Sequence, residues 1–330
     1  MAYRVAVTND YAEADGNTIF GDIGLHRLVE AGLTWEVLPE PMSPLQAHAL
    51  EGYDAVIVLG PERVTAESIP ASGRLRHVAR FGAGVDAIDV GALVAQSVTL
   101  TNTPEAVRRP MAHTAVTLLL GLAHNVLVKD QLVRTGRWAE RNKHRGRGLD
   151  AAIVGIIGLG GIGEEAARMV RALGADVVAY NRSDRSAVAN AIGVQMLPLD
   201  EVCRVSDFVI VTVAANAATH HLIGDRQLEL LGENGRLINI ARGSVVDQDA
   251  LIRRLQDGSI AGAGLDVFSE EPLSIDNPLT ALDNVILAPH SLCWTDGFTR
   301  AVSTSVMDAV IDVASGRAPA HPVRPESVHL

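Results

Sequence analysis

An arginine, a glutamate and a histidine each stand shortly after a short apolar run in the second half of the sequence. They are Arg242, Glu271 and His290. If the runs are parallel strands, their carboxyl ends meet at one edge of a sheet, where these side chains can converge. A histidine exchanges a proton near neutral pH, a nearby carboxylate favours its charged form, and a guanidinium can hold a carboxylate. Singly, each residue also fits a structural role; together they indicate a catalytic site.

Residues that could bind a nucleotide lie upstream. Gly158, Gly160 and Gly163 form the pattern G-x-G-x-x-G, between the apolar run 152–157 and the helical pattern 164–173. The glycines permit a tight turn, a close approach of a pyrophosphate and close helix packing, and the helix N-terminus directs N–H groups at the phosphates. The alternative is a structural turn, but the strand–turn–helix context favours a dinucleotide site. The expected contacts of the turn are Gly158, Gly160, Gly161, Ile162 and Gly163.

The residues after the second strand of this unit select between the two nicotinamide cofactors. A carboxylate there would bind the ribose hydroxyls of NAD and repel a 2′-phosphate. The chain has Asn181, Arg182 and Ser183 instead, with no carboxylate before Asp184. A guanidinium and a hydroxyl can both bind a phosphate. We therefore predict that NADP(H) is preferred and NAD(H) is possible; the alternative is that Arg182 faces solvent and Asn181 binds a plain ribose.

Short β-branched runs alternate with helical patterns along the whole chain. Their apolar residues are nearly continuous, as expected of parallel strands covered on both faces. They fall into two sets, so we predict an α/β fold with two doubly wound parallel-sheet (Rossmann-like) domains. The predicted strands are 4–8, 35–38, 55–59, 77–81 and 99–101, then 152–157, 176–180, 208–213, 236–240, 262–267 and 285–287.

Helices are expected to join the two domains. Pro110 fits a first helical position, and apolar residues recur at near-helical spacing over 111–133. A second helical stretch, 299–314, could pack back on the first domain. These hinge helices would place the active site in a cleft between the domains.

Composition limits the function further. The 330 residues are 48% hydrophobic and carry a net charge of −11, which argues against nucleic acid and anionic membranes as partners. The two cysteines, Cys203 and Cys293, cannot build a disulfide framework and suit a reducing compartment. Without a leader or a long apolar run, we expect a cytoplasmic protein; no spacing suggests a metal site.

Several motifs resemble the D-isomer-specific 2-hydroxyacid dehydrogenase family over nearly the whole chain. They are RFGAGVD at 80–86, NTP at 102–104, GRW at 136–138 and ARGSVVD at 241–247, in addition to the glycine pattern. The resemblance implies NAD(P)-dependent interconversion of a 2-keto acid and a D-2-hydroxy acid, with glyoxylate or hydroxypyruvate as the expected type of substrate. It also implies a homodimer formed through the cofactor domain. The expected domains are a flavodoxin-like substrate domain, 1–105 plus 293–330, and a dinucleotide-binding domain, 106–292.

The resemblance also assigns roles. Arg242, Glu271 and His290 occupy the catalytic positions, and the backbone around Ala83 and Gly84 would hold the substrate carboxylate, together with Arg242 and His290. The further cofactor contacts that it implies are Met111, Val213, Ala214, Thr219, Ala241, Arg242, Asp266 and His290. Trp294 departs from the family, which usually has small residues after the histidine, and could line the substrate pocket or a subunit contact.

Two other functions remain open at this point. One is a nucleotide-sensing binding scaffold, because the C-terminal-binding corepressors resemble this family and do not depend on turnover. The other is oxidation of another small oxyanion such as phosphite, which could use Arg242 and His290. Intact catalytic positions favour the dehydrogenase.

Overall fold

The computed structural model describes residues 2–325, and contacts divide them into two compact units. Unit 1 comprises the described parts of Met1–Pro110 and Trp294–Leu330, and unit 2 comprises Met111–Cys293. These limits lie close to the boundaries expected from the sequence. That unit 1 is the substrate domain and unit 2 the dinucleotide-binding domain stays a prediction.

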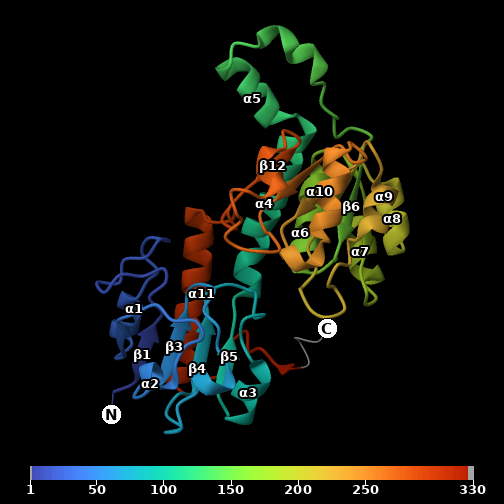
Figure 1. The fold of residues 1–330 in the computed structure, drawn as a ribbon. Helices are drawn as coiled ribbons and strands as arrows, with labels where there is room; N and C mark the ends of the chain where they lie inside the picture. The colour runs from blue at the N-terminus through green and yellow to red at the C-terminus, as the bar shows by residue number, and fades with distance from the viewer. Residues whose placement is uncertain (1, 326–330) are drawn as a thin grey trace. The chain divides into compact units, whose positions relative to one another are not determined.

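Unit 1 contains a five-stranded sheet in the order β2-β1-β3-β4-β5, with every neighbouring pair parallel (Figure 1). This order is that of flavodoxin-like folds, as predicted. The strands are β1 (Arg4–Val7), β2 (Thr34–Val37), β3 (Ala55–Val58), β4 (His77–Arg80) and β5 (Thr99–Thr101). The connecting helices are α1 (His26–Glu30), α2 (Ala47–Leu50), η1 (Ala66–Ser68) and α3 (Val90–Ala95).

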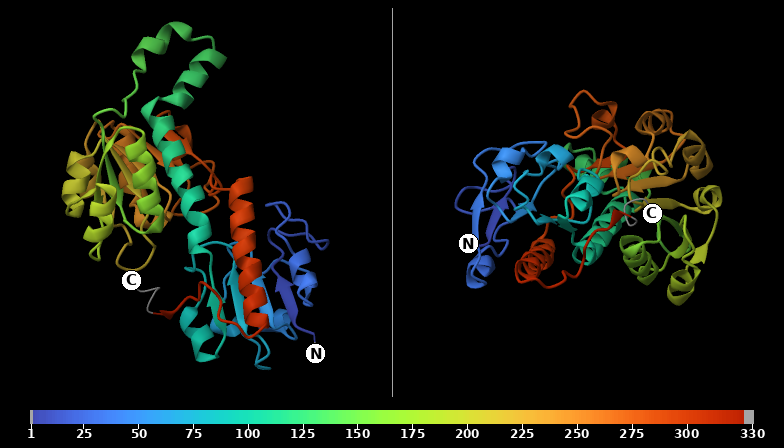
Figure 2. Two further views of the ribbon diagram at one scale, coloured as in Figure 1. Left: turned by 180° about the vertical axis from the view of Figure 1, so that it is seen from behind. Right: turned by 90° about the horizontal axis from the view of Figure 1, so that it is seen from below.

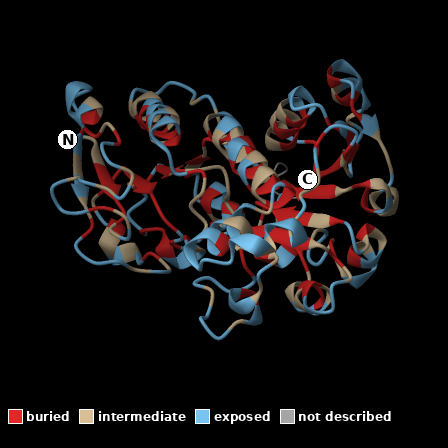
Figure 3. Cartoon of the chain, turned by 90° about the horizontal axis from the view of Figure 1, so that it is seen from above, coloured by how far each residue is buried: buried red, intermediate tan, exposed pale blue. Residues whose placement is uncertain are grey.

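Both faces of the unit 1 sheet are covered. Side chains from α2, η1 and α3 form one core with the strands, and they include Leu50, Leu93 and Val56. The other face lies against α1 and α11 (Asp296–Ala314), whose buried residues include Val302 and Val310. Figure 3 shows the result, with buried strands inside and helices exposed on their outer sides. The continuous apolar runs of the sequence are explained by this two-sided burial.

Unit 2 contains a seven-stranded parallel sheet in the order β12-β11-β10-β9-β6-β7-β8 (Figure 2). Six of its strands were predicted; β8 (Gln195–Met196) is too short to show a period. The other strands are β6 (Ile153–Ile157), β7 (Asp176–Tyr180), β9 (Phe208–Val211), β10 (Arg236–Asn239), β11 (Gly262–Leu265) and β12 (Val285–Leu287). The helices are α6 (Gly161–Ala172), α7 (Ser186–Ile192), α8 (Leu199–Val205), α9 (Asp225–Leu231), α10 (Gln248–Gln256), η3 (Gly243–Val245) and η4 (Pro278–Ala281).

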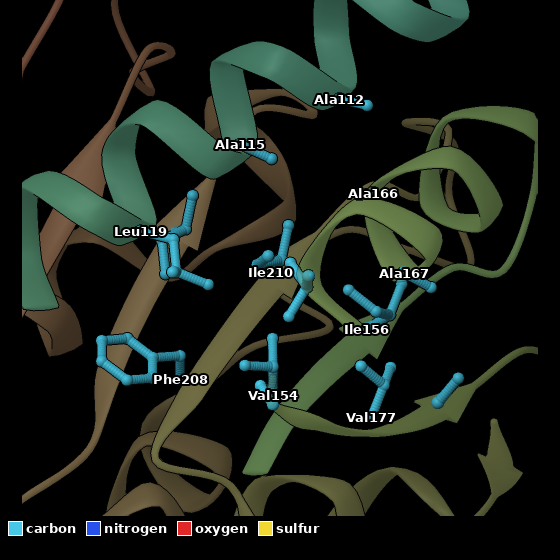
Figure 4. Close-up of a cluster of buried hydrophobic side chains, with 14 of the residues drawn as sticks. Ala112, Ala115, Leu119, Val154, Ile156, Ala166, Ala167, Val177, Phe208 and Ile210 are labelled. Atoms are coloured by element: carbon cyan, nitrogen blue, oxygen red, sulfur yellow. The ribbon is translucent and has the colours of Figure 1, made fainter. Parts of the chain in front are cut away.

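Alternate residues of the unit 2 strands enter two different cores. Val154 and Ile156 of β6 face helix α6 and the later part of α4 (Pro104–Ala123), where Ala112, Ala115 and Leu119 pack on them (Figure 4). The opposite face packs against α8, α9 and α10. Small side chains on α4 and α6 allow both helices to lie close to the sheet, which fixes the start of α6 beside the end of β6.

The helix predicted over 111–133 is different in the structure. It begins at Pro104 rather than after Pro110, and Pro110 lies inside α4. It then stops at Ala123, because Asn125 adopts a left-handed backbone (φ 52°), and α5 (Val126–Arg134) restarts after it. Pro104 also suits a first helical position, which explains why the sequence allowed two starting points.

Helix α5 and the following η2 (Trp138–Lys143) extend away from the seven-stranded sheet of their unit (Figure 1). We call residues 126–143 the arm. Its apolar side chains include Leu127 and Trp138, which are 45% and 61% exposed. Within residues 2–325, no single helix has the length and apolar composition to span a membrane; α4 and α5 meet that criterion only as a pair bent by 57°.

Candidate active site

The imidazole of His290 is hydrogen-bonded to the carboxylate of Glu271. Nδ1 of His290 lies 2.7 Å from Oε2 of Glu271, and the other carboxylate oxygen accepts the N–H of Phe268 at 2.9 Å. Burial by itself would raise the pKa of Glu271, but the bonds from His290 and Phe268 and the charge of Arg242 hold it below its ordinary value. Glu271 is therefore an anion that fixes the imidazole and leaves Nε2 for a substrate.

Arg242 is brought to the same group by a close approach of two loops. A Cβ on Gly243 would overlap the carbonyl of Phe268, so only glycine lets the turn after β10 pass the segment that carries Glu271. Asn239, which is buried, ties this turn by donating to the Arg242 carbonyl and accepting from the Ala241 N–H, both at 3.0 Å. The structure thus places Arg242 near Glu271, which is paired with His290, and the catalytic roles of the three residues stay predictions.

Asp266 holds the backbone that directly follows His290. It is 1% exposed, and its Oδ1 accepts the N–H groups of Ser291 at 3.0 Å and Leu292 at 3.3 Å. Burial raises the pKa of Asp266, and these bonds and the nearby His290 offset that only in part. His290 itself has a left-handed backbone (φ 54°), which the bonds to its successors help to hold. The sequence analysis places Asp266 among the cofactor contacts, and that role stays a prediction. The structure shows in addition that Asp266 positions the backbone after His290.

The glycine-rich turn has the geometry of a phosphate site. Gly158 has a positive φ of 103°, and a Cβ on Gly163 would overlap the Gly158 carbonyl oxygen. Gly160 has open space where a Cβ would be, so a ligand can approach its backbone. Among the described residues, the N–H groups of 161–163 in the first turn of α6 have no hydrogen-bond acceptor. The turn therefore fits a dinucleotide pyrophosphate.

The end of β7 carries no carboxylate. The Asn181 side chain accepts the Leu159 N–H at 3.0 Å and donates to Ser183 at 3.0 Å, so it links this end to the glycine-rich turn. Arg182 and Ser183 are exposed. Their contact with a 2′-phosphate stays a prediction.

The remaining predicted cofactor contacts lie on two segments of unit 2. Thr219 closes the loop after β9 by donating to the carbonyl of Ala214 at 2.8 Å. Val213 packs beside Gly158, where a Cβ would lie 2.8 Å from its Cγ1. Met111 packs against the core beneath α4. The structure explains their packing, and their contact with a cofactor stays a prediction.

We call the loop 82–84 in unit 1 the anion-binding nest, because the sequence predicts that its N–H groups hold the substrate carboxylate. Its three carbonyl oxygens accept hydrogen bonds from the Thr103 N–H at 3.0 Å, the Asn102 amide at 2.7 Å and the Arg80 guanidinium at 3.2 Å. With the carbonyls fixed, the three N–H groups of the loop have no acceptor among residues 2–325. Successive free N–H groups of this kind bind carboxylates.

The two cysteines are buried and fit structural roles. Cys203 and Cys293 are buried thiols, and burial raises the pKa of each to about 12, so neither is a thiolate at neutral pH. Over the described range, no group of three or more His, Cys, Asp or Glu side chains could hold a metal ion.

The arrangement can hold an oxyanion, move a proton and bind a dinucleotide. Sequence reasoning missed Asn239 and Gly243, which shape the Arg242 turn. A signal was present in both, since a polar residue ending a buried strand and a glycine after the arginine both suggest a constrained turn.

Comparison with known proteins covers nearly the whole chain. The profile described as "D-isomer specific 2-hydroxyacid dehydrogenase, NAD binding domain" matches residues 116–291. A glyoxylate reductase of Thermococcus gammatolerans is 36% identical over 304 residues, covering 89% of this chain and 91% of the relative. A D-3-phosphoglycerate dehydrogenase of Methanocaldococcus jannaschii is 32% identical over 95% of this chain but only 58% of its own length.

Solved structures agree with the fold. An NADPH-dependent glyoxylate/hydroxypyruvate reductase from Sinorhizobium meliloti, determined with NADP and malonate, has a TM-score of 0.83. It is 30% identical, and the similarity covers 98% of this chain and 97% of that one.

Proposed function

This chain belongs to the D-isomer specific 2-hydroxyacid dehydrogenase family, and from that premise we propose that its substrates are small 2-keto acids of the glyoxylate and hydroxypyruvate type. The family reaction, which this enzyme performs, interconverts 2-keto acids and 2-hydroxy acids with a nicotinamide dinucleotide. The glyoxylate reductases among its relatives support the choice of substrate, and so does the site.

The observation that carries the proposal is the His290–Glu271 pair beside Arg242. When bound, the nicotinamide supplies the hydride that reaches C2 of the keto acid. His290, held through Nδ1 by Glu271, gives its Nε2 proton to the keto oxygen as that oxygen becomes a hydroxyl. Arg242 stabilises the negative charge that develops on the oxygen before the proton arrives. In the reverse direction His290 accepts the proton.

The substrate carboxylate is assigned to the free N–H groups of 82–84 in unit 1. The carbonyls of the loop are fixed by the Thr103 N–H, the Asn102 amide and the Arg80 guanidinium, which leaves its N–H groups available for an anion. Arg80 donates also to the carbonyls of Val58 and Leu59, so its guanidinium braces the loop.

The cofactor is proposed to be NADP(H) in preference to NAD(H). The glycine-rich turn and the first turn of α6 would hold the pyrophosphate. Arg182 and Ser183 would hold the 2′-phosphate, because the end of β7 lacks the carboxylate that would repel it. The Sinorhizobium meliloti relative is described as NADPH-dependent.

The enzyme is further proposed to be a homodimer that buries the arm. Four large apolar side chains on the arm are 45–61% exposed. An exposed apolar surface of this kind is typical of a protein–protein interface. Leu127→Glu with Trp138→Glu should shift the light-scattering mass from dimer to monomer. Ile275→Glu, at an apolar position of unit 2 that is 82% exposed outside the arm, is the matched control and should leave the mass unchanged.

The test of the reaction is absorbance at 340 nm with glyoxylate and hydroxypyruvate, first with NADPH and then with NADH. Oxidation of NADPH at a higher kcat/KM than NADH supports both the substrate and the cofactor. A clear preference for NADH would contradict the proposed preference for NADP(H) and would leave the proposed substrate unaffected.

Two other outcomes favour other functions. Reduction of NADP⁺ by phosphite, without turnover of keto acids, would support the alternative function, which is oxidation of a small oxyanion. Tight nucleotide binding with no turnover of any acid or of phosphite would support a nucleotide-sensing scaffold.

A further inference from the structure

Five of the twelve aromatic residues of the chain form a single cluster in unit 1. Phe20 lies at its centre, and its ring centroid is 4.9 Å from Phe81, 5.0 Å from Trp294, 5.8 Å from Tyr11 and 6.1 Å from Phe298. The rings come from the loop after β1, the end of β4 and the beginning of α11. At these separations the rings are in contact and fill the space between them.

The cluster borders the anion-binding nest. Phe81 directly precedes the loop 82–84, and its ring stacks on Phe20. The Phe20 carbonyl also accepts a hydrogen bond from the Thr299 hydroxyl at 3.0 Å, which joins the loop after β1 to α11. A carboxylate held by the nest would therefore lie beside an aromatic wall of the same unit.

Trp294 forms the exposed end of this wall. Its relative exposure is 38%, whereas that of Phe81 is 3% and that of Phe298 is 5%. Trp294 is also four residues after His290. Because four residues span at most about 14 Å, the Cα atoms of Trp294 and His290 stay within that distance however the two units are arranged.

Trp294 is backed by side chains that cannot withdraw easily. It packs edge-on against Tyr11 as well as Phe20, with centroids 5.8 Å apart. The Tyr11 ring in turn lies against Gly60, where a Cβ would be 3.0 Å from Cε2 of Tyr11 and 3.2 Å from Oε2 of Glu62. Glu62 is buried, and it accepts the Gly60 N–H at 2.8 Å. Trp294 thus packs against rings that are themselves backed by buried groups.

We propose that Trp294, held by Phe20 and Tyr11, is a specificity-determining residue that limits the side chain of the 2-keto acid to a small group. This inference rests on the proposed function, since it takes the carboxylate to be at 82–84 and the keto oxygen to be at His290. A small substrate such as glyoxylate or hydroxypyruvate fits in front of the indole. An aromatic or branched group on C3 of the keto acid collides with the indole.

The test compares Trp294→Ala and Trp294→Phe with the wild-type enzyme on glyoxylate and phenylpyruvate. Removing the indole should raise kcat/KM for phenylpyruvate at least tenfold, mainly through a lower KM, and change the value for glyoxylate less than threefold. Trp294→Phe keeps a ring against Phe20 and should give a smaller gain. Ile275→Ala, which shortens an apolar side chain of unit 2 that is 82% exposed and lies outside the arm, is the control and should change kcat/KM for neither substrate.

Three outcomes overturn the inference. They are no gain for phenylpyruvate in either variant, an equal loss for both substrates, and a wild-type preference for phenylpyruvate over glyoxylate. If Trp294→Ala does not fold, Trp294→Phe alone decides between these results. Wild-type enzyme that reduces no keto acid at all contradicts the proposed function instead, so the two failures are distinguishable.

Discussion

The carboxyl edges of the two parallel sheets carry different kinds of side chain. The edge in unit 2 carries ionic and hydrogen-bonding groups, in which Glu271 holds His290 and Asp266 holds the backbone that follows. The edge in unit 1 carries aromatic rings beside an anion nest made of backbone N–H groups. In our proposal, the edge in unit 2 supplies the side chains that move protons and the edge in unit 1 limits the size of the substrate. We expect changes in unit 2 to affect turnover and changes in unit 1 to affect substrate choice and stability.

The largest effect should come from removing the proton donor in unit 2. His290→Ala should lower kcat by about 10³-fold, within the range of general acid catalysis, while the Kd for the dinucleotide changes little. Steady-state kinetics and fluorescence titration with NADPH measure the two quantities. A decrease in cofactor affinity as large as the decrease in kcat would mean that His290 holds the cofactor rather than the proton.

A change in the aromatic cluster of unit 1 should instead affect folding. Phe20→Ala removes the ring that four others contact, and it should lower the free energy of unfolding by about 3 kcal/mol. Urea denaturation measures this loss. Val29→Ala, which shortens a 60% exposed side chain of α1, is the control and should stay within about 0.5 kcal/mol of the wild type.

The stability of unit 1 should depend on pH through Glu62. Burial, with the nearby Asp10 carboxyl, raises the pKa of Glu62 to about 7 from its ordinary 4.5. The folded state therefore binds more protons than the unfolded state between these values, and this group costs stability as pH rises through that window. Glu62→Gln should gain about 3 kcal/mol over the wild type between pH 4.5 and pH 8. Chemical denaturation at the two pH values tests this, and a constant difference would show that Glu62 does not titrate in the window.

The smallest expected effect concerns the choice of cofactor in unit 2. Arg182→Ala should lower the NADPH-to-NADH ratio of kcat/KM by about tenfold, because one charged contact with the 2′-phosphate is lost. Arg168→Ala, on the outer side of α6, removes an equal charge and should leave the ratio unchanged. An unaltered ratio in Arg182→Ala would place the discrimination elsewhere.

The two edges also differ in how far the sequence revealed them. Arg242, Glu271, His290 and the glycines were identified because proton transfer and phosphate binding demand particular residue types at the ends of strands. The aromatic cluster was not, because Tyr11, Phe81 and Trp294 come from distant segments that share no local spacing. Only the fold brings them together.

Local backbone events were equally hard to predict. The interruption of the long helix depends on a left-handed Asn125, and no side-chain period reports that conformation. The supporting bonds of Asp266 and Asn239 depend on which strand lies next to which, and that order is a property of the sheet. Most strands could be predicted because two-sided burial imposes continuous apolar runs.

Unit 1 takes its residues from both ends of the described chain, and this has a consequence for synthesis. Strands β1 to β5 leave the ribosome before any of unit 2, whereas α11 follows all of it. At ~5–20 residues per second, the intervening residues take roughly 10–40 s to make. During that interval the face that Val302 and Val310 later cover has no permanent partner. Unit 1 therefore exposes an apolar sheet face until α11 has been made, whereas unit 2 can be complete before its neighbour is.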